Sequence, residues 1–205
     1  MATVLLARHG ETTWNRERRL QGWAPARLTD RGREQAAALA TALTARGPDR
    51  LVCSDLERSV ETADRVADEV GLDPAPDRAW RERDYGFLQG LPADEAFERF
   101  PRLSLDRGEA ALVERPDGGE SLREFADRVT RAWERLGADL DDDETVALVT
   151  HNGVVKTVLA RVEGRSLVER YRTETHPNCA LTEVTLRSAG ATVVREADTD
   201  HLSPD

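Results

Sequence analysis

The strongest constraint on the fold is an alternation of short apolar runs with longer segments of helical periodicity. Three apolar runs are too short for ordinary helices and suit buried strands. They cover residues 3–8, 51–54 and 145–151. Ala, Leu and Val recur with helical spacing over residues 28–47, 54–71, 118–140 and 152–164. Such alternation is typical of an α/β fold, so we expect a three-layer α/β/α architecture with a mostly parallel sheet.

The helical segments begin with residues that suit an N-cap. Thr29 or Asp30 can cap the first long helix. Ser54 or Asp55 can cap the second, which ends at Gly71. These signals place both helices on the carboxyl side of an apolar run, as the α/β pattern requires.

The remaining segments predict loops and a terminal hairpin. The two prolines within residues 74–76 predict a loop. Residues 179–197 alternate apolar and polar side chains and predict two antiparallel strands joined by a turn. We expect one domain over residues 1–205. Within it, residues 90–116 would form a short cap or insertion, and residues 198–205 a frayed tail.

Composition and charge narrow the function classes. The chain is 39% hydrophobic and 33% charged, with a net charge of −10. This acidity argues against nucleic acid and against an anionic membrane surface as partners, because both favour basic faces. No apolar run approaches the roughly 20 residues of a membrane span. The first residues lack the basic region of a signal peptide, so we expect a cytoplasmic protein.

Two of the four histidines end an apolar run and are followed closely by glycine. His9 closes LLARHG, and His151 closes ALVTHNG. Ligands of α/β sheets bind at the carboxyl ends of the strands, so neighbouring strands would aim both rings into one crevice. Three interpretations are open at this point: a metal site, hydrogen-bonded structural histidines, and nucleophilic catalysis on an anion. A metal site would need further ligands, and no His-x-x-x-His or paired-Asp pattern supplies them.

Arg8, directly before His9, favours catalysis on an anion. A guanidinium holds phosphate with parallel N–H donors. A neutral imidazole beside bound phosphate can attack phosphorus, and nearby cations favour the neutral form. This interpretation requires His9 and His151 to lie close together and within reach of solvent.

Further segments, in order along the chain, make the sequence resemble the histidine phosphatase superfamily, which contains the cofactor-dependent phosphoglycerate mutases. LLARHGETTWN resembles its Arg-His-Gly-Glu-Thr signature. The other matching segments are RLQGW, LTDRGREQA, VCSDLERSVETA, RERDYGFLQG, RPDGGES, ALVTHNGVV and NCALTEV. Together they span about residues 3–187, so the resemblance implies the phosphoglycerate mutase-like fold for nearly the whole chain.

The resemblance implies catalytic roles for five residues. His9 would be the nucleophile that becomes phosphorylated. Arg8 and Arg58 would clamp the phosphoryl group while charge builds on its oxygens. His151 would complete the pocket as a second cation or donor. Glu82 would give a proton to the leaving oxygen.

Other residues are expected to support these five. Asp84 is the nearest alternative to Glu82 as the acid. The residues expected to bind the substrate or its phosphate are Asn15, Gln21, Gly22 and Asn152. Gly22 could offer its backbone N–H. For Asn152, capping the helix that follows is an equally good interpretation.

The resemblance leaves two activities open. A phosphatase passes the phosphoryl group to water, whereas a mutase returns it to a bound sugar acid. In the mutases a longer insertion supplies further basic residues. Here the stretch from Gly90 to Pro116 is short and has no adjacent Arg pair, although ERDYGFLQG itself leans towards the mutases.

We therefore expect a phosphatase that needs no metal and acts on a small phosphorylated metabolite. The alternative is a phosphoglycerate mutase, which would use 2,3-bisphosphoglycerate as its cofactor. A non-catalytic protein that binds a phosphorylated ligand is less favoured, because each residue type that the chemistry needs is present. A homodimer is compatible with the sequence.

Overall fold

The computed structural model describes residues 1–173 and 175–203 and contains one six-stranded sheet. The strands are β1 (Ala2–Arg8), β2 (Arg50–Cys53), β3 (Pro74–Pro76), β4 (Thr145–Thr150), β5 (Leu181–Arg187) and β6 (Gly190–Asp198). Their order across the sheet is β3-β2-β4-β1-β5-β6. The first four are mutually parallel, and β5 and β6 form the expected antiparallel hairpin.

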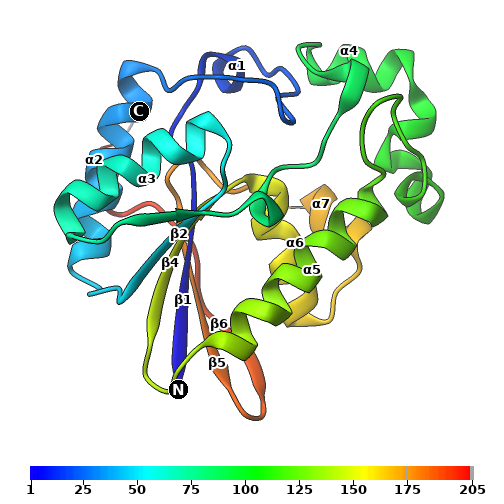
Figure 1. The fold of residues 1–205 in the computed structure, drawn as a ribbon. Coiled ribbons are helices and arrows are strands. Elements are labelled where there is room, and N and C mark those ends of the chain that lie inside the picture. The colour runs from blue at the N-terminus through cyan, green and yellow to red at the C-terminus, as the bar shows by residue number, and fades with distance from the viewer. Residues whose placement is uncertain (174, 204–205) are drawn as a thin grey trace.

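Helices cover both faces of the sheet, as an α/β fold requires (Figure 1). One face carries α2 (Asp30–Thr44) and α3 (Glu57–Val70), and the other carries α5 (Leu122–Asp139) and α6 (Asn152–Glu163). The short helices are α1 (Thr13–Arg16), α4 (Ala93–Arg99) and α7 (Leu167–Thr173). Short 3-10 helices cover residues 78–80, 86–88, 101–103 and 105–112. Among the described residues, no helix is both long and apolar enough to cross a membrane.

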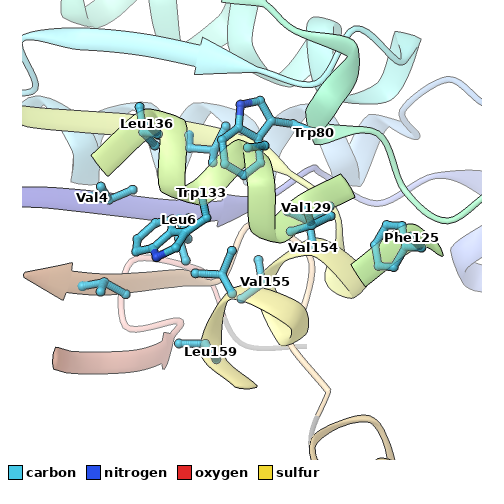
Figure 2. Close-up of a cluster of buried hydrophobic side chains, with 14 of the residues drawn as sticks. Val4, Leu6, Trp80, Phe125, Val129, Trp133, Leu136, Val154, Val155 and Leu159 are labelled. Carbon is cyan, nitrogen blue, oxygen red and sulfur yellow. The ribbon is translucent and has the colours of Figure 1, made fainter. Parts of the chain in front are cut away.

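Two cores separate the sheet from its helices because successive strand residues point to opposite faces. Val4 and Leu6 of β1 pack with residues of α5 and α6, and Figure 2 shows Trp133 and Val155 beside them. Leu5 and Ala7 pack with α2 and α3 on the other face; the buried partners there include Leu39, Leu43 and Val66. The buried strand pattern predicted from the sequence is therefore confirmed.

The segment between β3 and α5 lies beyond the carboxyl ends of the parallel strands (Figure 1). Leu88, Ala96 and Leu103 of this segment pack with Leu20, from the loop after α1, in a small third core. The ring centroids of Phe87 and Phe100 lie 4.9 Å apart, edge to face, beside this core. Within the segment, residues 90–116 contain α4 and two of the 3-10 helices, at the edge where ligands bind in α/β folds.

Two local expectations are wrong. Leu56, rather than Ser54 or Asp55, is the N-cap of α3. The Ser54 hydroxyl contacts His151, and the Asp55 carboxylate holds Arg81 at 2.6 Å, so both are used elsewhere. Residues 74–76 pair with β2 as an edge strand, a position that tolerates proline.

The chain after Ala197 also differs from the frayed tail that was expected. Asp198 still belongs to β6, and the His201 ring lies 3.0 Å from the Cys179 carbonyl oxygen. Leu202 packs against the core between the sheet, α2 and α3. These contacts hold residues 198–203 against the domain; residues 204–205 lie outside the described part of the chain.

Candidate active site

The two histidines that end apolar runs lie side by side. β1 pairs with β4 in parallel, with Arg8 opposite Thr150, so His9 and His151 are the next residues of neighbouring strands. The His9 amide donates to the Thr150 carbonyl at 2.9 Å. The two ring centroids are 5.2 Å apart, edge to face. The predicted convergence of the rings is therefore confirmed.

Hydrogen bonds define which nitrogen of His9 can react. Nδ1 lies 2.8 Å from the Gly10 carbonyl oxygen, which can only accept, so Nδ1 carries the proton. Nε2 then carries the lone pair, and it accepts from Arg58 Nε at 3.1 Å. Burial lowers the pKa of His9 well below 6.5, and the charges of Arg58 and Arg8 lower it further. His9 is thus a neutral imidazole with its Nε2 lone pair directed at a guanidinium.

The local backbone at His9 depends on Gly10. A Cβ atom at this position would overlap the Gly32 carbonyl oxygen at the start of α2. The Gly10 amide donates to Thr62 on α3 at 3.1 Å. Glycine therefore lets the chain leave β1 in close contact with both helices, and this holds the His9 ring at the sheet edge.

Two guanidiniums flank His9. Arg58, on the first turn of α3, is 1% exposed and donates to the Gly22 carbonyl at 2.8 Å. Arg8 donates to the His176 carbonyl at 2.6 Å, and its buried Nε has no hydrogen-bond partner among the described residues. Burial lowers the pKa of each arginine to about 10, so both stay charged at neutral pH. The buried charge of Arg58 and the partly buried charge of Arg8 favour an anionic ligand.

His151 has one occupied and one available nitrogen. Nε2 lies 2.8 Å from the Ser54 hydroxyl and 3.3 Å from that of Ser59. Nδ1 is buried and has no partner in the described part of the chain. Burial, then Arg58 and His9, lower the pKa of His151 well below 6.5. An available nitrogen beside the His9 ring suits a group that hydrogen-bonds a phosphoryl oxygen.

Glu82 reaches this centre across the start of α6. Its Oε2 accepts from the Gly153 amide at 3.0 Å, and its Oε1 accepts from the Arg83 amide at 2.9 Å. A Cβ atom at residue 153 would overlap the carboxylate and force it to move, so the glycine allows this close approach. The Glu82 charge acts on both Arg8 and Arg58, which places it within the same site.

Asp84, the alternative acid, is used in a turn. Its Oδ1 accepts from the Gly86 amide at 2.9 Å. Its own amide donates to the Glu120 carboxylate, and its carbonyl accepts from the Glu120 amide. The geometry therefore favours Glu82 over Asp84 as the proton donor.

In this structure the four expected binding residues form hydrogen bonds with other groups of the protein. Asn15 forms a capping box with Thr12 at α1. Gln21 accepts from the Thr12 hydroxyl at 3.1 Å, and the Gly22 carbonyl binds Arg58. Asn152 accepts from the His176 amide at 3.2 Å, while His151 occupies the N-cap of α6. Direct contact of these four residues with phosphate stays a prediction.

The accessibility of the site differs from the expectation. His9 is 3% exposed and His151 is fully buried. Arg58 causes much of this closure, because its guanidinium lies between His9 Nε2 and the Gly22 carbonyl. In this structure the Arg58 guanidinium therefore occupies the Nε2 lone pair of His9.

Three contributors to the site were missed in the sequence. Ser54 and Ser59 hold the His151 ring, and Asn178 donates to the His9 carbonyl at 2.9 Å and to Asn15 at 3.2 Å. Ser54 follows β2, the neighbour of β4, so the strand-end rule that identified the histidines was a usable signal for it. Asn178 has no comparable signal, because it comes before an antiparallel strand.

A groove elsewhere in the fold, a cluster of metal-ligating side chains or a reactive cysteine could each indicate a different site. A groove of about 610 Å³ between α5 and the β2–β3 edge contains Arg50, Trp80 and Arg135, and none of the predicted catalytic residues lines it. Across residues 1–173 and 175–203, His, Cys, Asp and Glu form no group of three or more that could hold a metal ion. Cys53 and Cys179 are buried free thiols.

Comparisons with known proteins agree with the geometry. The chain is 39% identical over 166 residues to the phosphoglycerate mutase-like protein 4 of Arabidopsis thaliana, covering 78% of this chain and 70% of that protein. It is 31% identical to the probable phosphoglycerate mutase GpmB of Escherichia coli, covering 98% and 95% of the two chains.

Solved structures include phosphatases with the same fold. A mycobacterial glucosyl-3-phosphoglycerate phosphatase matches with a TM-score of 0.85 and 28% identity, over 96% of this chain and 99% of that one. An alpha-ribazole phosphatase from Shigella flexneri matches with a TM-score of 0.84 and 26% identity, over 96% of each chain. The family model of the histidine phosphatase superfamily (branch 1) matches residues 4–199. The chain therefore belongs to the histidine phosphatase superfamily.

Proposed function

We propose that this protein hydrolyses phosphomonoesters of small metabolites through a phosphohistidine at His9, without a metal ion. The observation that carries the proposal is the neutral His9 ring, whose Nε2 accepts from the buried Arg58 guanidinium and which lies beside an available His151 nitrogen. A lone pair surrounded by fixed cations suits attack on a dianionic phosphate.

The first step forms the His9 Nε2–phosphorus bond and breaks the phosphorus–oxygen bond of the ester. Glu82, in its protonated form, gives its proton to the leaving oxygen. Arg8 and Arg58 stabilise the charge on the phosphoryl oxygens, and His151 Nδ1 faces the same group. For this step Arg58 must exchange its bond to His9 for bonds to phosphate.

The second step returns the enzyme to its starting state. Water attacks phosphorus while the Glu82 carboxylate takes one proton from it. The nitrogen–phosphorus bond breaks, its electron pair returns to His9 Nε2, and inorganic phosphate leaves. Each group thus ends in the protonation state in which it began, so no further reactant is needed.

The segment over residues 90–116 supports hydrolysis over mutase chemistry. Three of its four arginines are in ion pairs with nearby carboxylates: Arg99 with Glu95, Arg102 with Glu114, and Arg115 with Glu124. Cations paired in this way are poorly suited to grip a second acidic group of a substrate. The likeness to GpmB is the observation that favours the mutase alternative.

The test is to incubate the purified full chain with p-nitrophenyl phosphate in the presence of a metal chelator. Release of phosphate supports the proposal. In parallel, 2- and 3-phosphoglycerate are assayed for interconversion with and without the bisphosphate. Interconversion that depends on the bisphosphate, with negligible hydrolysis, would instead establish the mutase. A panel of phosphomonoesters then identifies the substrate class.

A further inference from the structure

All three guanidinium nitrogens of Arg128, on α5, donate hydrogen bonds near the site. Its Nε and Nη2 bind the two carboxylate oxygens of Glu120 at 2.9 and 2.8 Å. Its Nη1 donates to the carbonyls of Ala79 and Arg81 at 2.9 and 3.0 Å, and Nη2 also donates to the Glu82 carbonyl at 3.2 Å. One partly buried guanidinium therefore binds a carboxylate and three carbonyls of the segment that carries Glu82.

This segment depends on side chains for its shape. Residues 81–85 lie between two short 3-10 helices and outside any strand. The Glu82 carbonyl accepts from both Arg128 and the Trp23 indole, the latter at 2.7 Å. With the carbonyl held on one side, the Glu82 carboxylate reaches the Gly153 amide on the other. The direction of the carboxylate thus depends on how its own backbone is held.

Glu120 extends the same network past Glu82. It accepts from the Asp84 amide at 3.1 Å, and its own amide donates to the Asp84 carbonyl at 2.8 Å. Arg128 and Glu120 therefore hold the backbone before and after Glu82. A lysine could not replace this arginine, because an ammonium lacks the planar set of five donors.

We propose that Arg128 is a positioning residue for proton transfer by Glu82. It acts through the backbone of residues 79–82 and sets the angle at which the Glu82 carboxyl meets the leaving oxygen. This inference rests on the proposed function. A displacement of a reacting group by about 1 Å can cost about 100-fold in rate, so a loosened Glu82 segment should be visible in kinetics.

The test compares Arg128→Met with Arg131→Met, an exposed arginine on the same helix. Each variant is assayed with p-nitrophenyl phosphate, which needs little help from an acid, and with glycerol phosphate, whose alkoxide needs a proton. We expect Arg128→Met to lower kcat/KM about 10- to 100-fold for glycerol phosphate and less than about threefold for p-nitrophenyl phosphate. Arg131→Met should leave both unchanged.

A double variant separates positioning from a general structural effect. If Arg128 acts through Glu82, adding Arg128→Met to Glu82→Gln should cause little further loss on glycerol phosphate. Equal losses on the two substrates, or additive losses in the double variant, would overturn the inference. If Arg128→Met does not fold, Arg128→Lys is assayed instead, and its losses of kcat/KM on the two substrates are compared in the same way.

The same data distinguish a failure of this inference from a failure of the proposed function. If the wild-type protein hydrolyses neither ester, both the proposed function and the role of Arg128 are rejected. Selective loss in Glu82→Gln combined with unselective loss in Arg128→Met rejects only the role of Arg128.

Discussion

At the scale of single residues, the site depends on a histidine that stays neutral in a strongly cationic setting. Burial and two guanidiniums lower the pKa of His9, and the Gly10 carbonyl fixes the proton on Nδ1. Both effects keep Nε2 unprotonated at neutral pH, with its lone pair accepting from Arg58. In the proposed mechanism the same guanidiniums also stabilise the phosphoryl group, so one set of charges would prepare the nucleophile and bind its target.

The role of Glu82 leads to a prediction about leaving groups. Glu82→Gln removes the proposed proton donor but keeps the size and polarity of the side chain. We expect kcat/KM to fall by about 100-fold or more for glycerol phosphate and by less than about tenfold for p-nitrophenyl phosphate, because only the alkoxide needs protonation. Steady-state kinetics on both esters measure this ratio.

Asp84→Asn is the matched control, since Asp84 lies two residues away and serves a turn. It should affect both esters alike and only slightly. A larger selective loss in Asp84→Asn than in Glu82→Gln would assign the proton to Asp84 instead.

At the scale of elements, the sequence predicted the strands and the histidines at their ends. It did not predict which strands lie next to each other in the sheet. His9 and His151 each end an apolar run, and that was enough to place both rings at one sheet edge. The order β2-β4-β1 depends on long-range packing that local patterns do not contain. Without that order, Ser54 was interpreted as a helix cap, although it lies next to His151.

The missed features share one physical origin, namely contacts between segments distant in sequence. Residues 74–76 form a strand only because the outer edge of β2 is available to them. Arg58 closes the site through the carbonyl of a loop 36 residues earlier in the chain. Arg128 is one of many arginines in the sequence, and only the fold brings it to the segment of Glu82.

The capping box of α5 gives a prediction for this element. Ser121 accepts from the Glu124 amide at 3.1 Å, and the Glu124 carboxylate accepts from the Ser121 amide at 2.8 Å. Ser121→Ala should lower the free energy of unfolding by about 1 kcal/mol, because it leaves an amide of the first turn without its acceptor. Urea denaturation measures the change. Ser188→Ala, in the exposed turn between β5 and β6, should change it by less than about 0.5 kcal/mol.

At the scale of the whole molecule, the buried histidine pair couples stability to pH. In the unfolded chain both imidazoles titrate near 6.5, whereas folding lowers the pKa of His9 and of His151 well below that value. Below about pH 6.5 the unfolded chain therefore binds more protons than the native protein, and the free energy of unfolding falls as pH falls.

The expected slope is measurable. Between about pH 6 and 5, the two histidines together should lower the free energy of unfolding by up to about 2.7 kcal/mol per pH unit. Denaturant titrations of the wild type and of a His9→Asn, His151→Asn double variant measure the difference between their slopes. The double variant should show the flatter slope. Parallel slopes would mean that the two rings are protonated in the folded protein.

The central claim is that the phosphoryl group resides on His9 during turnover. The most direct measurement is to mix the protein with excess p-nitrophenyl phosphate, quench in base to preserve nitrogen–phosphorus bonds, and map the peptides by mass spectrometry. The account predicts one phosphoryl group on the His9 peptide of the wild type and none in an inactive His9→Asn variant. Rapid hydrolysis with His9 unmodified throughout, or His9→Asn turning over at the parental rate, would contradict it.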